Sequence, residues 1–238
     1  MNNIELVKIE KELFNLIEQE IVKKEYLVEE FVHKYPYEVG KIIYKQVQNN
    51  SFVKNILMFS VVIKQVLPHI ADEFYIPTLT KLIKQEDLEL RIRYQTIQLL
   101  GWRGNEAKEA IPFLLRNLEE NVSLKQISAI ALAKIGYEKF DELVPYLLST
   151  LKNAKVYNTR MNAARLLVSH ESNWQEKLPG LIDALEKDPD FRVRQKIARY
   201  FGEINEEGVK EALLKAYNED SHPIVRTVAK TSLVDLGD

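Results

Sequence analysis

The sequence predicts an all-α repeat structure, because three features recur along it at nearly equal intervals. An apolar residue followed by proline recurs from Ile76-Pro77 onward, with 35, 33 and 34 residues between successive prolines of the series. A basic residue recurs five times, at spacings of 32, 35, 34 and 32 residues, and small or apolar residues follow it at fixed offsets. The prolines are Pro77, Pro112, Pro145 and Pro179, and the basic residues are Arg93, Lys125, Arg160, Arg194 and Arg226. This period is typical of repeats built from two helices.

Each proline is predicted to lie in the first turn of a helix. A short amphipathic run follows each of them, for example IPFLLRNLEE at residues 111–120. Proline costs no hydrogen bond in the first turn, because the N–H group that it lacks has no partner within the helix there. The four prolines therefore mark the first helix of successive helix pairs.

The basic residue marks the second helix of each pair. Six residues before it, four of the five units have an acidic residue, namely Asp87, Glu119, Asp188 and Asp220. An arginine placed in this way can bond the carboxylate of its own turn or that of the neighbouring repeat, forming a ladder along the stack. Arg194 is expected to pair with Asp188 in this scheme.

The combined pattern, apolar-Pro, Asp, Val-Arg-x-x-Ala-Ala and Leu-Gly, resembles the HEAT-repeat family and in particular its short bacterial, PBS-lyase-type form. Five units at residues 71–238 carry it, although Ala154 replaces the acid of the third unit and Glu211 the proline of the fifth. The resemblance implies a right-handed α-α superhelix of antiparallel helix pairs. It also implies that the second helices line a concave face.

The first 70 residues carry the pattern less clearly. Residues 1–35 have apolar residues at helical spacing and are expected to form an N-terminal helical cap. Residues 36–70 read as a degenerate repeat, with Ser51 as helix cap and Lys54 in the basic place. Terminal repeats are commonly atypical because one of their faces meets water. We therefore expect residues 1–238 to form a single solenoid domain.

Composition indicates a cytoplasmic protein that does not enter a membrane. The chain of 238 residues has no cysteine, and no apolar stretch is long enough to span a bilayer. With 33 basic and 35 acidic residues, the balance of charge argues against a general nucleic-acid binder. Residues 139–205 nevertheless contain 11 basic and 9 acidic residues, so a local basic patch is possible there.

Motifs for catalysis, metal binding and cofactor binding are missing from the sequence. The four histidines, His33, His69, His170 and His222, show no metal-ligand spacing and are read as surface or packing residues. The eight glycines form no phosphate-binding loop. We accordingly expect no catalytic residue, no metal and no small-molecule cofactor.

The repeat phase predicts which side chains line the groove. Counted from the basic residue, positions −1, +3, +4 and +7 should face the core, so that +1, +2 and +5 project into the groove. The candidate binding residues are Tyr94, Gln98, Gln126, Asn162, Arg165, Gln195, Lys196 and Arg199, and the remaining positions include Gln95, Ile127, Ile130, Met161, Thr227, Val228 and Thr231. Such a groove suits a protein or peptide partner with an acidic or phosphate-bearing segment, although an ordinary solvated face is the alternative.

The sequence therefore favours a non-catalytic scaffold that binds a protein or peptide. One alternative is an enzyme similar to the HEAT-like alkylpurine DNA glycosylases, for which Trp102, Trp174 and Glu106 supply the residue types. Both tryptophans are more simply read as packing residues. A bilin-lyase-like protein and an immunity or regulatory protein are further alternatives.

Overall fold

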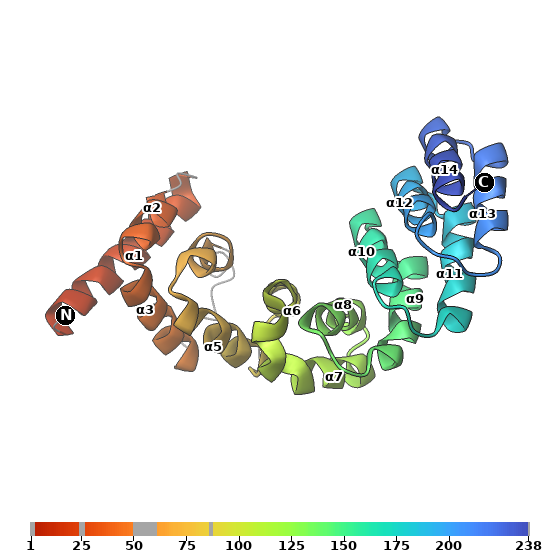
Figure 1. The fold of residues 1–238 in the computed structure, drawn as a ribbon. Coiled ribbons are helices and arrows are strands. Elements are labelled where there is room, and N and C mark those ends of the chain that lie inside the picture. The colour runs from red at the N-terminus through yellow and green to blue at the C-terminus, as the bar shows by residue number, and fades with distance from the viewer. Residues whose placement is uncertain (1–2, 24–26, 50–60, 86–87, 238) are drawn as a thin grey trace. The chain divides into compact units, whose positions relative to one another are not determined.

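The computed structural model describes residues 3–23, 27–49, 61–85 and 88–237. This part of the chain is helical and contains no strand, which confirms the predicted all-α class (Figure 1). Two compact units divide the chain, Met1–Leu114 and Leu115–Asp238. None of the described helices is long and apolar enough to cross a membrane.

The first unit contains the predicted cap and the beginning of the repeats. Its elements are α1 (Asn3–Lys23), α2 (Leu27–Lys34), α3 (Pro36–Gln48), the π-helical η1 (Val62–Val66), the short 3₁₀ helix η2 (Leu67–His69), α5 (Asp72–Ile83), α6 (Leu90–Arg103) and the 3₁₀ helix η3 (Gly104–Ala110). Helix α1 packs on α2 and α3, and α5 packs between α3 and α6. The predicted cap is thus a pair of helices. Ser51 and Lys54 lie outside the described residues.

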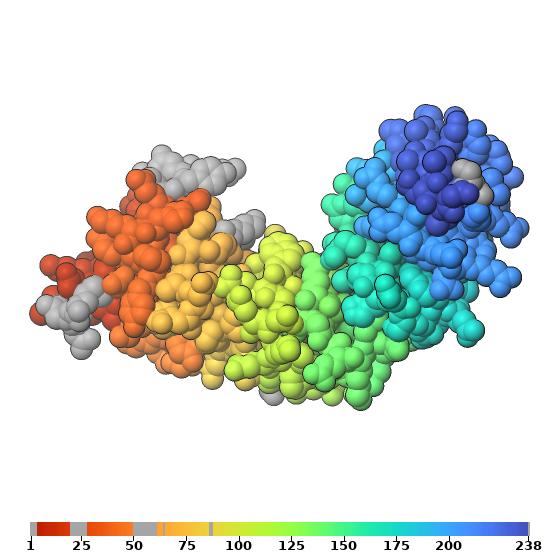
Figure 2. Space-filling model, viewed as in Figure 1, coloured from red at the N-terminus to blue at the C-terminus, as the bar shows by residue number. Residues whose placement is uncertain are grey.

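The second unit is a stack of helix pairs. Its elements are α7 (Ile111–Glu120), which begins just before the boundary, α8 (Lys125–Ile135), the 3₁₀ helix η4 (Phe140–Leu143), α9 (Val144–Asn153), α10 (Tyr157–Val168), α11 (Trp174–Lys187), α12 (Phe191–Phe201), α13 (Val209–Glu219) and α14 (Pro223–Asp235). Helices α9, α11 and α13 contact one another in order, and so do α8, α10, α12 and α14. First and second helices therefore form two layers, and the space between helices α9 to α14 is filled by side chains (Figures 1 and 2).

The predicted core positions of the second helices are buried with two exceptions. In α12, Val193, Ile197, Ala198 and Phe201 are fully buried, which are the −1, +3, +4 and +7 positions. Only Thr159, half-buried in the first turn of α10, and Lys230, exposed on α14, depart from the pattern. The repeat phase read from the sequence therefore identifies the buried face of these helices.

Two of the four prolines do not stand where the sequence predicted. Pro112 and Pro145 are the second residues of α7 and α9, as expected. Pro77 and Pro179 instead lie inside α5 and α11, because each helix begins five residues earlier. Acidic residues in the first turns, such as Asp72 and Glu176, favour these earlier starts through the helix dipole.

The buried arginines form the predicted ladder, but each one binds the carboxylate of the following repeat instead of the carboxylate of its own turn. Arg160 donates to both carboxylate oxygens of Asp188, at 2.7 and 2.8 Å, and Arg194 does the same to Asp220, at 2.8 and 2.9 Å. Each arginine also donates to the carbonyl six residues before it, Arg194 to that of Asp188 at 2.7 Å. The expected carboxylate pair of Arg194 with Asp188 is therefore wrong, because Arg160 of the preceding repeat already occupies that carboxylate.

Candidate binding face

The candidate binding face is the surface of α8, α10, α12 and α14 formed by the +1, +2 and +5 positions. Arg165 and Arg199, both at +5, are exposed, whereas Asn162, Gln195 and Lys196 are half-buried. Helix α10 packs directly on α8 and on α12, so side chains from successive repeats lie next to one another on this face. The solenoid stacking thus gathers residues that are about 34 positions apart in sequence.

Four basic side chains on this face, Lys134, Arg165, Lys196 and Arg199, form what we call the basic cluster. Burial lowers the pKa of Lys134, and the positive charge of Arg165 lowers it further. Burial raises the pKa of Tyr200, while the charges of Arg165 and Arg199 act to lower it. These effects require the charges to be close, so the cluster extends from α8 through α10 to α12.

The basic cluster has no carboxylate partner among the described residues. None of its four side chains forms an ion pair or a hydrogen bond there, although the charge of Glu203, in the turn after α12, acts to raise the pKa of Tyr200. Arg160 and Arg194 on the same two helices are buried and fully paired. The cluster therefore leaves positive charge available to a negatively charged ligand.

The remaining candidate residues are distributed over both units. Tyr94 is 37% exposed and Gln98 half-buried on α6, in the first unit, and Gln126 is half-buried on α8, in the second. The two isoleucines expected beside Gln126 do not line the face, since Ile127 and Ile130 are only 5% and 4% exposed. Most of α8 is apolar or small and is buried around its circumference, so these side chains belong to the core.

Lys134 and Tyr200 were missed by the sequence reasoning. Lys134 stands at +9, four residues after the +5 position, and side chains four residues apart share a helix face. Extending the groove pattern by one turn would therefore have found it. No comparable signal marks Tyr200 at +6, which the structure places beside the two arginines.

The two tryptophans have different surroundings. Trp102 is 61% exposed at the end of α6, so the prediction that it packs is wrong, and Glu106 four residues later pairs with Arg103 at 3.2 Å. Trp174 begins α11 and is half-buried, with the ammonium group of Lys177 4.2 Å from its ring centroid. Trp174 also lines a pocket of about 680 Å³ on the first-helix layer, away from the basic cluster.

Lys177 is a fully buried lysine that no sequence pattern indicated. Its ammonium group donates to the backbone carbonyl of His170, and burial lowers its pKa. His170 stacks on Phe140 with 3.6 Å between ring centroids, and burial lowers its pKa as well. His222 stacks on Phe191 and caps α14 by accepting from the N–H group of Ile224. For His170 and His222, the predicted packing role is confirmed.

Stacked pairs of helices with an arginine–aspartate ladder define an α-helical repeat protein. Residues 144–234, which cover α9 to α14, match the family model described as HEAT repeats. Residues 144–234 are therefore HEAT repeats, as the spacing of the prolines and basic residues predicted for this part of the chain. A comparison with curated proteins gave no match.

Proposed function

We propose that this protein is a scaffold that binds an acidic segment of a partner protein on the basic cluster of the second unit. HEAT repeats form helical scaffolds whose broad faces commonly mediate protein interactions. The observation that carries the proposal is the contrast between two sets of arginines. Arg160 and Arg194 are satisfied within the stack, whereas Arg165 and Arg199 have no anionic partner among the described residues.

The chemistry of the cluster favours carboxylate or phosphate groups on an extended segment. Arginine presents its N–H groups in a planar fork that matches such oxyanions in a bidentate manner. Asn162 and Gln195 lie on the same helices and supply amide groups, which can bond the backbone of the bound segment. The positions are repeated along the stack, so an extended ligand would meet one set of donors at each repeat.

Binding of defined peptides tests this function. We expect a fluorescently labelled glutamate-rich peptide to bind the full chain more tightly than a neutral peptide of equal length, with an affinity that falls as salt is raised. The variant Arg165→Glu/Arg199→Glu should weaken binding by about tenfold or more, because it places like charges opposite the ligand. Fluorescence anisotropy measures both quantities.

A matched control separates the site from the net charge of the protein. Lys152→Glu/Lys155→Glu makes the same change in charge with two exposed lysines, one on α9 and one in the turn after it. This control variant should bind the peptide much as the wild type does. Equal weakening by both double variants, or none by either, would contradict a site at the basic cluster.

The enzymatic alternatives rest on residues in separate units. Trp102 and Glu106 are in the first unit, where Arg103 pairs with Glu106, and Trp174 is in the second unit, beside Lys177. Duplex DNA in the same anisotropy assay, at about 50 mM salt, distinguishes a nucleic-acid partner from an acidic peptide. Tighter binding of DNA than of the peptide, lost in Arg165→Glu/Arg199→Glu, would favour the nucleic-acid alternative.

A further inference from the structure

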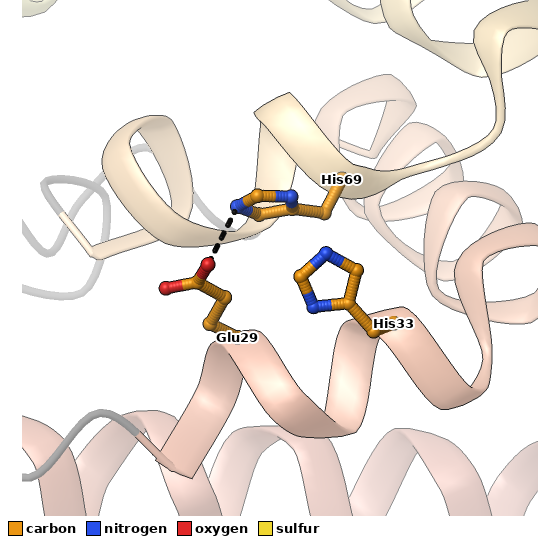
Figure 3. Close-up of side chains that lie close together, drawn as sticks. All are labelled: Glu29, His33 and His69. Atoms are coloured by element: carbon orange, nitrogen blue, oxygen red, sulfur yellow. Dashed lines mark ion pairs between the residues drawn. The ribbon is translucent and has the colours of Figure 1, made fainter.

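Two histidines and a glutamate come together in the first unit, although the sequence separates them. Glu29 and His33 lie one turn apart on α2, and His69 ends η2, 36 residues after His33 (Figure 3). One ligand atom from each side chain lies within 4.8 Å of the others. The spacing of the histidines along the chain did not indicate that His33 and His69 are neighbours, with 4.4 Å between their ring centroids.

The separations are close to those of a tetrahedral zinc site. Bonds of about 2.0–2.1 Å at tetrahedral angles place neighbouring ligand atoms about 3.3 Å apart. Oε1 of Glu29 lies 3.5 Å from Nε2 of His69, and the two imidazole ring centroids are 4.4 Å apart. The two rings lie side by side in Figure 3 but are tilted by 53° to each other, so the His33 side chain would have to rotate for one of its ring nitrogens to approach the same ion.

The three side chains are available to a metal ion. His33 is exposed, and its ring nitrogens form no hydrogen bond or ion pair among the described residues. Glu29 and His69 are half-buried, so a bound ion would be sheltered on one side and open to water on the other. Two imidazoles and one carboxylate suit a borderline ion such as Zn²⁺, whereas Mg²⁺ and Ca²⁺ prefer oxygen ligands.

We propose that Glu29, His33 and His69 bind one Zn²⁺ ion, with a water molecule as fourth ligand. The ion would cross-link α2 and η2, two segments that already pack on one another. This linkage would stabilise the N-terminal helices of the first unit in the folded state. The site is independent of the basic cluster, so neither proposal depends on the other.

Metal titration of the tag-free full chain tests the site. After removal of metal with a chelator, Zn²⁺ is added in competition with a chromophoric chelator, and we expect one equivalent to bind. Loss of a ligand in His33→Ala or His69→Ala should weaken binding by more than about tenfold, since even the loss of a group that only orients a ligand costs that much. Zn²⁺ should also raise the Tm of the wild type but not of the variants.

Several controls make the result decisive. Glu30→Gln alters the exposed neighbour of Glu29 on the same helix and should leave Zn²⁺ binding unchanged. Mg²⁺ should not compete with Zn²⁺, and Co²⁺ should give the intense visible absorption of a four-coordinate ion, lost in His69→Ala. Circular dichroism establishes that the variants are folded, which is expected for His33→Ala because His33 is exposed. Zn²⁺ binding that is absent in the wild type, or undiminished in His33→Ala/His69→Ala, would overturn the proposal.

Discussion

Arginines on α10 and α12 have two different environments, although they are only five residues apart. Arg160 and Arg194 at the zero position are about 6% and 8% exposed, and each bonds the aspartate of the next repeat and the carbonyl of its own turn. Arg165 and Arg199 at +5 extend into solvent without a partner among the described residues. A helical offset of five residues turns the side chain away from the stack, and this offset separates the structural arginines from the candidate ligand-binding ones.

The carboxylate of Asp220 in the ladder is held ionised by its partners. Burial acts to raise the pKa of Asp220, but the hydrogen bonds from Arg194 and from the backbone N–H of His222 outweigh it, so the pKa lies below its usual value. Asp220 therefore accepts from two repeats at once, as Asp188 does from Arg160 and from the N–H of Asp190. Each aspartate fixes the turn in which it stands as well as the neighbouring repeat.

At the scale of single residues, we predict that Arg160→Met strongly destabilises the protein. Asp188 would keep a buried charge with its main partner removed, and breaking a buried ion pair in this way costs about 3–5 kcal/mol. The side chain of Asp188 is 3% exposed, so water cannot replace the arginine easily. The free energy of unfolding in urea measures the effect.

Arg165→Met is the matched control for this prediction. It removes the same type of side chain from the same helix, but at an exposed position without an ion pair, so the expected change is within about 0.5 kcal/mol. The affinity for the acidic peptide should fall in Arg165→Met, although the stability of this variant should be nearly unchanged. Equal destabilisation by the two substitutions would mean that the ladder does not stabilise the stack.

At the scale of the helices, the layers depend on positions where two backbones come close. A methyl group added to Gly202 would lie 3.0 Å from Cβ and 3.1 Å from Cα of Ser232, so the end of α12 approaches the backbone of α14 closely there. Gly202 stands eight residues after Arg194, the basic residue of its repeat. Its φ of −63° is one that alanine can adopt, so the backbone conformation does not require glycine at this position. The close approach of α14 is what favours a residue without a side chain.

We therefore predict that Gly202→Ala destabilises the protein while Gly180→Ala does not. The methyl of Gly202→Ala would press on the backbone of α14, which costs about 1–3 kcal/mol for an overpacked core site. In Gly180→Ala the new methyl would lie 2.5 Å from Cδ2 and 3.7 Å from Cγ of Leu148, but Cδ2 is the end of a half-buried side chain that can rotate away. Alanine also has a higher helix propensity than glycine, by up to about 1 kcal/mol, and Gly180 lies inside α11.

Thermal and urea unfolding of the two variants provide the comparison. Gly202→Ala should lower the Tm, whereas Gly180→Ala should leave it unchanged or raise it slightly. A larger loss of stability in Gly180→Ala than in Gly202→Ala would contradict the assignment of the close contact.

At the scale of the molecule, the contacts that stabilise the second unit come from neighbouring repeats. Arg160 binds Asp188 and Arg194 binds Asp220, and the two helix layers contact in sequence order. Repeat proteins of this kind gain stability from each interface between adjacent repeats. That the whole chain is one solenoid domain stays a prediction, since each of its two units is compact by itself.

We predict that a fragment of residues 111–238, which begins at the start of α7, folds on its own. It keeps the arginine ladder and the core of α9 to α14 complete. Circular dichroism should show a helical protein that unfolds cooperatively in urea, with a smaller m-value than the full chain because less surface is exposed. A fragment that lacks a cooperative transition would show that the second unit depends on residues 1–110.

Much of the fold and part of the candidate site were accessible from the sequence. The repeat period gave the helix pairs, the buried positions of α12 and the exposed positions of Arg165 and Arg199. The starts of α5 and α11 were placed too late, because proline is tolerated in the first turn but does not have to stand there. The repeat pattern also placed Ile127 and Ile130 on the exposed face, although both are buried. The helix phase alone does not reveal how much of α8 its neighbours cover.

The sequence by itself determined the all-α repeat architecture, because a period of about 34 residues and a helical phase are local properties of the chain. Only the tertiary structure decided which aspartate each arginine binds, since Asp188 is six residues from Arg194 yet bonds Arg160 through its carboxylate. The tertiary structure likewise brought His69 to Glu29 and His33. Contacts between residues so far apart depend on how the helices pack, which the spacing of residues along the chain does not specify.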